Sequence, residues 1–418
     1  MKDSGIDWIG KIPNEWEINK IDSLYTLRNT KVSDKNYPPL SVTMKGIVPQ
    51  LATAAKSDDG DNRKLVKKGD FVINSRSDRR GSSGISNYDG SVSLINTILT
   101  PRGKMNPDYY NWLFHTVQFE DEFYKWGHGI VDDLWTTRWQ DMKNISVLVP
   151  PEEAQEKIAR FLDKKCAQID SIIEESKKSI EEYKSWKQSM IFEAVTGKNL
   201  SCKKKNSGIE WLGEIPETWE VRRFKCIIDS FEKGNGITKE EVFSDGDTFC
   251  VRYGEIYSKY DNSFENCFSK TFKDKIPVKK YFSNGDLLFA GTGELVEEIG
   301  KCVAYLGNEH CLAGGDIIIA KHKQNAKFLS YAMNSHYVQA QKSCNKAKLK
   351  VVHISATEIG NVLLALPPIS EQESIAKFLD AKCAQIDSLI SEKQSLIKDL
   401  AEYKKSLIFE AVTGKRRV

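Results

Sequence analysis

The sequence predicts an α+β protein. Two mixed α/β domains alternate with two long helices, which form an intramolecular antiparallel coiled coil with pseudo-two-fold symmetry. Three observations support this prediction: the chain repeats itself once, the unrepeated parts alternate short apolar runs with turns, and the repeated parts carry a helical apolar stripe. A chain of 418 residues is also longer than one hydrophobic core usually serves. The expected boundaries are 1–150 and 201–367 for the two domains, and 151–200 and 368–418 for the two helices.

The internal repeat has three anchors, and the residues between them diverge. The first anchor recurs at an offset of 203, and the other two recur at an offset of 217. The paired segments are 4–13 with 207–216, 161–171 with 378–388, and 191–198 with 408–415. The difference between the offsets, 217 − 203 = 14, places 14 extra residues in the variable loops of the second domain. One chain therefore carries two copies of a framework that present two different surfaces.

Composition bounds the class of protein. The hydrophobic content of 40% and the charged content of 28% are typical of a soluble globular protein. No apolar run approaches the length of a membrane helix, and no apolar signal region follows Met1, so we expect a protein that is not exported. The nine cysteines form no C-x-x-C pair, which favours reduced thiols in the cytoplasm. A net charge of +3 means that any DNA-binding patch has to be local.

In the first domain, strands are expected over 70–74, 92–95 and 145–149, and a helix over 109–123. The second domain has a similar pattern, because residues 285–289 match residues 69–73 at an offset of 216. A further strand is expected there over 315–320, and a helix over 328–341. Both domains are thus predicted to mix strands and helices.

The long helices are predicted from apolar residues that recur every three or four positions, with charged residues between them. Pro151 suits a first helical position, and Ser370 with Glu373 fits a capping box at the second helix. Gly197 and Gly414 stand where C-terminal caps are expected. Two tandem domains, each with its own helix folded back on it, are the alternative architecture. The residues expected to pack in the helix seam are Ile158, Phe161, Leu162, Ile169, Ile172, Ile180, Ile375, Phe378, Leu379, Ile386, Leu389 and Leu400.

The sequence contains none of the usual catalytic, cofactor-binding or metal-binding signatures. It has no G-x-x-x-x-G-K-[ST] phosphate loop, and its glycine pairs lack the third glycine of a dinucleotide motif. The six histidines show no metal-ligand spacing. Residues 106–109 resemble a methyltransferase N-P-P-[FY] loop but lack the second proline, so they are expected to start a helix. We therefore predict no catalytic residue, no cofactor and no metal in this chain.

Basic and polar clusters on loops are the candidates for contact with DNA. The loop after residues 69–74 combines arginine, serine and glycine, and arginine can bind guanine edges while serine and backbone amides hold phosphates. In the second domain, alternate lysines over 346–350 form a possible phosphate track. A solvated charged turn is the alternative interpretation of each cluster. The candidate residues are Thr43, Lys45, Arg76, Arg79, Arg80, Ser82, Arg252, Tyr253, Thr292, Lys346, Lys348 and Lys350.

These features together resemble the specificity subunit of a type I restriction–modification system. Residues 366–380 read L-P-P-I-S-E-Q-E-S-I-A-K-F-L-D, similar to the family motif L-P-P-x-x-E-Q-x-x-I-A-x-F-L-D. Residues 149–163 fit the same motif, except that Ala154 replaces its glutamate. The segments W-I-G-K-I-P at 8–13 and W-L-G-E-I-P at 211–216 resemble the start of the family's target recognition domains. The resemblance covers nearly the whole chain.

The resemblance implies a non-catalytic subunit that recognises DNA. Each α/β domain would be a target recognition domain that reads one half of a bipartite, asymmetric double-stranded site. The helices would fix the gap between the half-sites and bind two modification subunits, which methylate adenine N6 with S-adenosylmethionine. Restriction subunits would add ATP- and Mg-dependent translocation and cleavage. The alternatives are a coiled-coil scaffold that binds only proteins, an enzyme with an unrecognised site, and a variant that serves a related methylase with a different nuclease.

Overall fold

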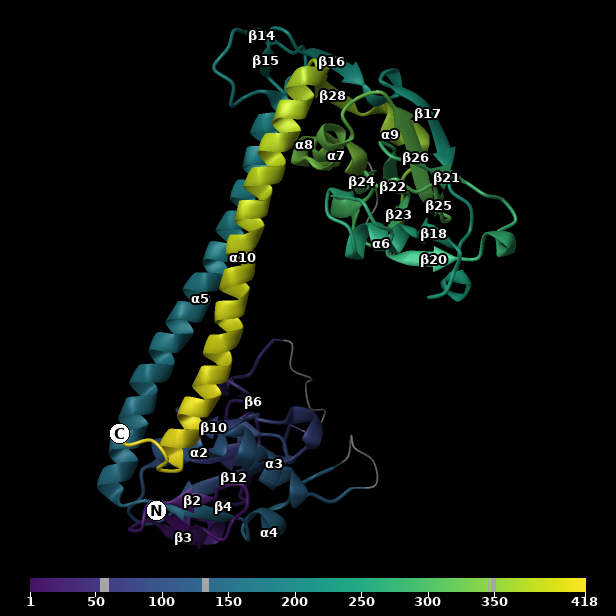
Figure 1. Cartoon of the computed structure of the whole chain (residues 1–418). Coiled ribbons are helices and arrows are strands. Elements are labelled where there is room, and N and C mark those ends of the chain that lie inside the picture. Colours follow the sequence, from purple (N-terminus) through teal and green to yellow (C-terminus); the bar gives the residue numbers. More distant parts are fainter. Residues whose placement is uncertain (53–59, 130–134, 345, 347–350) are drawn as a thin grey trace. The chain divides into compact units, whose positions relative to one another are not determined.

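The computed structural model describes residues 1–52, 60–129, 135–344, 346 and 351–418. It divides into two compact units (Figure 1). Unit 1 comprises Met1–Lys177 and Gln394–Val418, and unit 2 comprises Lys178–Lys393. Each unit therefore contains one block of strands and short helices together with one end of each long helix. Among the described residues, no helix carries a stretch long and apolar enough to cross a membrane.

The core of unit 1 is an antiparallel four-stranded sheet in the order β10-β9-β12-β4. These strands are β4 (Tyr25–Arg28), β9 (Phe71–Asn74), β10 (Ser83–Ile85) and β12 (Asn96–Pro101). A three-stranded sheet, a hairpin and two further strand pairs complete the described strands. They are β5 (Lys31–Val32), β8 (Arg63–Val66) and β11 (Gly90–Val92); β6 (Leu40–Thr43) and β7 (Gly46–Pro49); β1 (Lys2–Asp3) and β2 (Lys11–Ile12); and β3 (Glu17–Lys20) and β13 (Ser146–Val149). The short helices are α1 (Ile21–Leu24), α2 (Pro107–Phe114), α3 (Val117–Lys125) and α4 (Trp139–Met142), with a 3-10 turn η1 (Ser77–Arg79).

Unit 2 repeats this plan around a five-stranded sheet in the order β17-β26-β22-β24-β19. These strands are β17 (Ile228–Lys233), β19 (Ser263–Phe264), β22 (Leu287–Ala290), β24 (Cys302–Tyr305) and β26 (Ile317–His322). A second sheet has the order β20-β18-β25-β21, with β18 (Thr248–Val251), β20 (Ser269–Thr271), β21 (Tyr281–Phe282) and β25 (Cys311–Ala313). The remaining pairs are β14 (Lys204–Asn206) with β15 (Glu214–Pro216), β16 (Glu220–Arg223) with β28 (Leu363–Leu366), and β23 (Thr292–Gly293) with β27 (Val352–His353).

The short α-helices of unit 2 are α6 (Tyr253–Ser258), α7 (Ala326–Asn334), α8 (His336–Ser343) and α9 (Ala356–Asn361). Of these, α7, α8 and α9 follow the same order as α2, α3 and α4 of unit 1, whereas α6 has no counterpart between β6 and β7. The 3-10 turns are η3 (Phe224–Cys226), η4 (Lys239–Glu241), η5 (Lys273–Lys275) and η6 (Val296–Glu298). In both units, a strand whose four residues are all buried, β9 or β22, lies inside its sheet rather than at the edge.

The single helices expected over 109–123 and 328–341 are each broken into two. Thr116 ends α2 and caps α3, because its Oγ1 accepts a hydrogen bond from the Phe119 backbone N–H at 3.2 Å. Ser335 lies at the matching break between α7 and α8, where its hydroxyl donates to the Ala332 carbonyl at 2.5 Å. A short hydroxyl side chain offers the backbone an alternative partner, so it favours a helix end over a helix interior. Apolar spacing alone did not reveal these breaks.

The strand expected over 92–95 is also misplaced. β11 ends at Val92 and β12 begins at Asn96, while Leu94 and Ile95 lie in an exposed turn between them. The Asn96 side chain fixes this turn by donating to the Ser93 carbonyl at 3.1 Å. The apolar run therefore contains a turn between two strands, because hydrogen bonds of the Asn96 side chain to Ser93 stabilise the turn conformation.

The long helices are α5 (Glu152–Thr196) and α10 (Ile369–Val412). Both begin after a Pro-Pro pair, and the second proline is the N-cap: the Pro151 carbonyl accepts from Gln155 N–H and the Pro368 carbonyl from Gln372 N–H, each at 3.0 Å. Pro151 is thus a cap rather than a first helical residue. The capping box expected at Ser370 is wrong, because Ser370 already lies inside the first turn of α10.

The glutamine of the repeated motif ties each long helix to the helix pair of its unit. Gln155 Oε1 accepts from the Asn106 N–H at 2.9 Å, and Gln372 Oε1 accepts from the Asn325 N–H at 3.0 Å. Both glutamines are buried. Glu371, whose counterpart is Ala154, accepts from the Trp219 indole at 2.8 Å. The motif therefore fixes each long helix against its unit. Because Ala154 has no carboxylate, unit 1 lacks the hydrogen bond that Glu371 makes to a tryptophan in unit 2.

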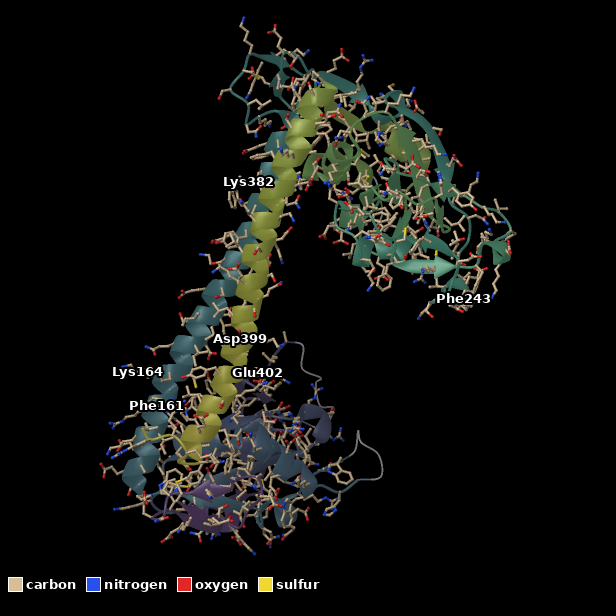
Figure 2. All side chains as sticks on the ribbon, in the orientation of Figure 1. Phe161, Lys164, Phe243, Lys382, Asp399 and Glu402 are labelled. Atoms are coloured by element: carbon tan, nitrogen blue, oxygen red, sulfur yellow. The ribbon has the colours of Figure 1, made fainter. Side chains whose placement is uncertain are left out.

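The ends of α5 and α10 run antiparallel within each unit (Figures 1 and 2). In unit 1, the start of α5 shares a core with the end of α10, and Lys404 forms an ion pair with Asp170 at 2.7 Å. In unit 2, the end of α5 shares a core with the start of α10, and Lys187 forms an ion pair with Asp387 at 2.7 Å. Each unit holds an end of both helices. The antiparallel prediction is therefore confirmed, and the tandem alternative is wrong.

Most residues expected in the helix seam are covered, but three are not. Ile158, Leu162, Ile169, Ile180, Leu379 and Ile386 are buried, and Phe161, Ile375 and Leu400 are half-buried against the cores. Ile172, Phe378 and Leu389 are 44%, 40% and 39% exposed, so their assignment to the seam is corrected. Consecutive residues point about 100° apart on a helix, so only one of two adjacent apolar residues can face the seam. Their neighbours Ile173, Leu379 and Ile390 take that place.

Candidate nucleic-acid interface

In unit 1, a cleft of about 700 Å³ lies between the β6–β7 hairpin, the loop after β9 and the turn before β12. Four residues predicted from the sequence line it: Thr43, Arg79, Arg80 and Ser82. They come from segments almost 40 residues apart, because the loop after β9 folds back over the hairpin. The structure thus brings part of the predicted set together.

The loop after β9 is held in place by its own backbone. The Asn74 side chain accepts from the Arg76 N–H at 3.0 Å, and Asn74 N–H donates to the Ser82 carbonyl at 2.9 Å. The Ser75 hydroxyl lies 3.0 Å from the Thr97 hydroxyl on β12. Gly81 has a φ of +73°, which a residue with a side chain adopts at a cost. This arginine-bearing loop is therefore a fixed turn.

The two neighbouring arginines of this loop have different surroundings. Arg80 is bound to α3: its guanidinium pairs with Glu120 at 3.2 Å and with Asp121, and it lies 5.5 Å from the Tyr124 ring. Arg79 has a side chain that is 67% exposed, and among the described carboxylates it forms an ion pair with Asp78 alone, at 3.6 Å. Arg80 therefore anchors the loop, whereas Arg79 has donors available for a ligand.

Further polar residues of the cleft were missed from the sequence. They are Ser41, Gln50, Asn74, Ser93 and Asn96, together with the buried Arg63. Among the described residues, the buried Asn96 Oδ1 has no hydrogen-bond partner. Amide side chains suit the donor and acceptor edges of adenine, as arginine suits guanine. No spacing signal marks these residues, because they meet only when β6, β9 and β12 assemble.

Two predicted residues of unit 1 lie apart from the cleft lining. Lys45 is exposed at the tip of the β6–β7 turn, where its N–H donates to Thr43 Oγ1 at 3.1 Å. Arg76 is half-buried and forms a β-bridge with Thr136. The Tyr124 hydroxyl donates to the Arg76 carbonyl at 3.2 Å, so the Arg76 backbone helps to secure the loop.

In unit 2, the position that corresponds to Arg76 is Thr292, at the offset of 216 that relates residues 69–73 to 285–289. Thr292 pairs with His353 across β23 and β27, as Arg76 pairs with Thr136. Thr292 Oγ1 lies 3.0 Å from His353 Nδ1, and Lys346 Nζ donates to the His353 carbonyl at 2.6 Å. The two predicted residues Thr292 and Lys346 are therefore joined through one histidine.

Lys346 is held by its own unit. Its ammonium pairs with Glu358 at 2.8 Å, and its side chain is 11% exposed. It lines a cleft of about 560 Å³ together with Lys233, Asp316 and His353. Lys348 and Lys350 lie outside the described residues. The lysine track therefore stays a prediction, with one lysine engaged in an ion pair.

Arg252 and Tyr253 lie at the start of α6, where Arg252 forms an ion pair with a buried carboxylate. Glu255 is buried, and it receives hydrogen bonds from the Arg252 guanidinium at 3.0 and 3.2 Å and from the Ser269 hydroxyl at 2.6 Å. A buried carboxylate needs such partners, since burying an unpaired charge is costly. Tyr253 is 39% exposed beside it. Arg252 thus has a structural task that the sequence did not reveal.

Two copies of one framework present two unlike polar clefts, which defines a recognition protein with two different surfaces. The unit 1 cleft has basic, hydroxyl and amide side chains, whereas the unit 2 cleft has lysine, histidine and carboxylate side chains. The family model described as the type I restriction modification DNA specificity domain matches residues 13–182 and 216–399. The chain therefore belongs to the family of type I restriction–modification specificity subunits. This membership does not favour the alternative of a coiled-coil scaffold without DNA specificity.

Curated relatives extend over nearly the whole chain. The chain is 24% identical to the type I restriction enzyme MjaVIII specificity subunit of Methanocaldococcus jannaschii, over 98% of this chain and 94% of that protein. It is 25% identical to the putative MjaX specificity subunit of the same organism, over 98% and 96%.

Solved structures share the fold. A chain from a study of complex assembly and conformational transition of the type I R-M system has a TM-score of 0.74 at 15% identity, covering 97% of this chain and all of that one. The HsdS subunit from Thermoanaerobacter tengcongensis has a TM-score of 0.57 at 15% identity, with full coverage of both chains.

Proposed function

We propose that this chain reads a bipartite, asymmetric sequence in double-stranded DNA, one half-site for each unit. The observation that carries this proposal is that the framework is repeated while the clefts differ. In unit 1 the loop after the central strand presents Arg79 beside amide side chains, whereas in unit 2 the matching place holds Thr292, His353 and Lys346. Two different sets of donors and acceptors suit two different half-sites.

The long helices are proposed to fix the gap between the half-sites. α5 has 45 residues, so it is about 68 Å long at 1.5 Å per residue. One turn of DNA is about 34–36 Å, so a helix of this length is on the scale of two turns. Linking two recognition sites rigidly makes the second binding event intramolecular, which strengthens binding only when both sites can engage at once.

We also propose that the chain binds two copies of one modification subunit through exposed apolar residues that recur on the helices. Unit 1 presents Phe161, Ile172 and Tyr403, and unit 2 presents their equivalents at an offset of 217. Those equivalents are Phe378, Leu389 and, from 403 − 217, Trp186. All are well exposed except Phe161, which is half-buried. Exposed apolar residues on a shared face mark an interaction site.

The spacing of these residues places them on one side of each helix. Steps of 11 and 14 residues are close to whole numbers of turns at 3.6 residues per turn. In an antiparallel pair, residues at the same angle from the seam lie on the same face of the pair. Each unit thus offers three equivalent positions, with phenylalanine at one, an aliphatic residue at the second and an aromatic residue at the third. This similarity supports two identical partners rather than two different ones.

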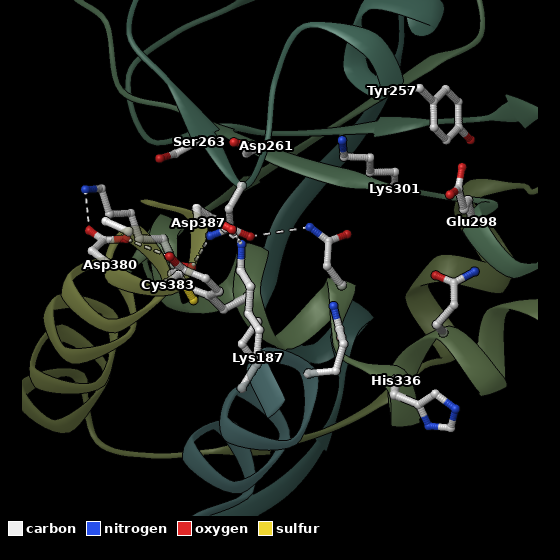
Figure 3. Close-up of a pocket in the computed structure, with 18 of the residues that line it drawn as sticks. Lys187, Tyr257, Asp261, Ser263, Glu298, Lys301, His336, Asp380, Cys383 and Asp387 are labelled. Carbon is white, nitrogen blue, oxygen red and sulfur yellow. Dashed lines mark hydrogen bonds and ion pairs between the residues drawn. The ribbon is translucent and has the colours of Figure 1, made fainter. Parts of the chain in front are cut away.

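A second repeated feature lies where the helix pair meets the short helices. In unit 2, a cleft of about 800 Å³ is lined by Lys187, Ile191, His336 and Asp387 (Figure 3). The ion pairs of Lys187 with Asp387 and of Lys327 with Asp380 cross its wall. In unit 1, a cleft of about 410 Å³ is lined by residues that include Ile408, the equivalent of Ile191. Repeated hollows beside repeated apolar residues fit two copies of the same partner.

In this proposal the chain itself is non-catalytic and holds no cofactor. S-adenosylmethionine, ATP and Mg are assigned to the partner subunits. Support comes from the sequence, which has no phosphate loop and no histidine spacing typical of a metal site. Restriction subunits would complete the assembly.

Mapping methylated adenines in cells that express this chain with its modification subunit tests the proposal. We expect two different half-sites separated by a constant gap. Deleting seven residues from each helix, 173–179 and 390–396, removes about 10 Å of helix while keeping the seam nearly in phase. The preferred gap should then shorten by about three base pairs, or methylation should be lost. An unchanged gap with undiminished methylation would contradict the proposed role of the helices.

Native mass spectrometry tests the stoichiometry. The wild-type chain should bind two modification subunits, and the paired variant Ile172→Asp with Tyr403→Asp should bind one. The equivalent pair, Leu389→Asp with Trp186→Asp, should also leave one. Lys164→Asp is a matched control on exposed helix surface. Retention of both subunits by either double variant would exclude the apolar site.

A further inference from the structure

Unit 2 carries a set of half-buried and exposed phenylalanines and lysines that lines none of the four clefts described above. We define this lysine–phenylalanine surface by three lysines and four rings on and beside β18 and β20. Phe243 is labelled in Figure 2, and β18 and β20 are labelled in Figure 1. The members are Lys259, Lys270, Lys275, Phe243, Phe249, Phe268 and Phe272.

The strand register creates the centre of this surface. Phe249 on β18 lies directly opposite Lys270 on β20, and the Lys270 ammonium is 4.8 Å from the Phe249 ring centroid. Side chains alternate along a strand, so the neighbours Ser269 and Thr271 are buried while Lys270 points outward. Lys270 is therefore presented by the sheet rather than by a loose loop.

Two further lysines extend the surface on either side. The Lys275 ammonium lies 4.0 Å from the Phe243 ring centroid and 5.1 Å from that of Phe272, and these two rings are 5.1 Å apart. The Lys259 ammonium lies 4.2 Å from the Phe268 ring, which is 64% exposed. Each ammonium is thus held over a ring face by cation–π attraction.

The charge of this surface is not neutralised within the described structure. Residues 268–280 contain five lysines and one aspartate. None of Lys259, Lys270 and Lys275 is in an ion pair with a described carboxylate. Nearby carboxylates are engaged elsewhere: Glu255 pairs with Arg252, and Asp247 accepts from Thr248 and from the Lys273 N–H. The aromatic rings fix the lysines while leaving their N–H donors available.

We propose that the lysine–phenylalanine surface binds the sugar–phosphate backbone of double-stranded DNA next to the half-site that unit 2 reads. This inference rests on the proposed function. An ammonium is a point charge that suits phosphate oxygens and carries no base code. The rings are covered by lysines or packed on each other, which favours backbone contact over the base stacking typical of single-stranded binding.

The described residues of unit 1 form no such surface, and the chain takes a shorter path there. In unit 1, β6 and β7 are joined by the Met44-Lys45 turn, whereas in unit 2 the segment between β18 and β20 holds α6 and β19. The surface therefore gives the two half-sites unequal amounts of backbone contact. Binding to the unit 2 half-site should depend more strongly on salt.

The test is the salt dependence of DNA binding by the full chain with its modification subunits. Each phosphate contact adds about 0.9 to the slope of log K against log salt for B-DNA. The triple variant Lys259→Gln, Lys270→Gln and Lys275→Gln should lower this slope by about two to three while the methylated sequence stays the same. The matching triple Lys→Arg variant should restore the slope.

The matched controls are two lysines of the same kind in the repeated framework. Lys198 lies 4.5 Å from the Phe192 ring, and Lys415 lies 4.3 Å from the Phe409 ring. Lys198→Gln and Lys415→Gln should leave the slope unchanged. If the triple Gln variant keeps the wild-type slope, or loses only single-stranded binding, the surface proposal is overturned while the proposed function stands. If the wild-type complex shows no sequence preference, the proposed function fails instead.

Discussion

Units 1 and 2 are built from the same framework but differ in the surfaces they present. Three central strands match in order, β9-β12-β4 with β22-β26-β17, although β17 has a register shift between Ile228 and Ser230 that β4 lacks. Both helix pairs break at a hydroxyl residue. The differences begin where the matching strands end. Arg76 in one unit is Thr292 in the other, and a two-residue turn in one is replaced by α6 and β19 in the other. Repeated sequence therefore encodes packing, and diverged sequence encodes recognition.

Because the framework is repeated, equivalent residues of the helix seam in the two units should contribute equally to the free energy of unfolding. Leu162→Ala and Leu379→Ala each remove a fully buried side chain, so each should lower the free energy of unfolding by about 2–5 kcal/mol. Urea unfolding measures the loss, and hydrogen exchange assigns it to a unit. Ile172→Ala and Leu389→Ala are the exposed controls and should change stability by less than about 0.5 kcal/mol. A large loss from only one of the two leucines would break the equivalence.

The next prediction concerns the glycines that end the long helices. Gly197 and Gly414 have φ angles of +69° and +68°, and an added Cβ would lie 2.4 Å from Pro216 and 2.6 Å from Pro13. Gly→Ala at either position should cost about 2–4 kcal/mol, since left-handed strain and a steric clash add.

Gly208→Ala is the control for this prediction. Gly208 has a φ of +76° with open space around it, so the substitution adds strain alone. It should cost about 1–2 kcal/mol in the same thermal or urea unfolding measurement. Equal losses for Gly208 and Gly414 would show that the contact with the proline does not matter.

The smallest predicted effect is a loss of stability at low pH in unit 2 that unit 1 does not share. Burial lowers the pKa of His322 to about 4, and its Nδ1 accepts from the Gln324 N–H at 3.1 Å. The unfolded histidine has a pKa of about 6.5, so the folded state binds fewer protons between these values. The stability from neutral His322 is present above about pH 6.5 and is lost as the pH falls toward 4.

We expect this loss to be about 1–3 kcal/mol, because the ring is half-buried and solvent screens part of the shift. The matching position in unit 1 is Pro101, which does not titrate. Hydrogen exchange at pH 7 and pH 5 should show unit 2 weakening more than unit 1, and His322→Gln should remove that difference. If His322→Gln keeps the full difference, another group is responsible.

The sequence predicted the framework well, for a physical reason. A repeat with unchanged apolar spacing has to bury both stripes, and the nearest partner for each helix is its own copy. It did not predict which of two adjacent apolar residues faces the seam, as Ile172 and Ile173 show. The sequence analysis also missed the helix breaks at Thr116 and Ser335. At both positions a hydroxyl side chain forms a hydrogen bond with the backbone and ends the helix, although the apolar spacing continues.

The candidate site was predicted only in part. The arginine-rich loop was found because its composition is unusual, but composition did not separate Arg79, which is exposed, from Arg80, which is bound to α3. The sequence predicts that Arg252 contacts DNA, whereas in the structure its guanidinium donates to the buried Glu255 carboxylate. The lysine–phenylalanine surface was missed because its members span residues 243–275 and meet only through strand pairing.

By itself, the sequence determined that two amphipathic helices pair within one chain and that two unlike domains accompany them. Periodicity and repetition are properties of the chain order, so they can be read directly from it. Only the tertiary structure decided which basic side chains are free to meet DNA and which already have partners. That choice depends on contacts between distant segments, where a carboxylate or a ring a few ångströms away sets the role of each charge.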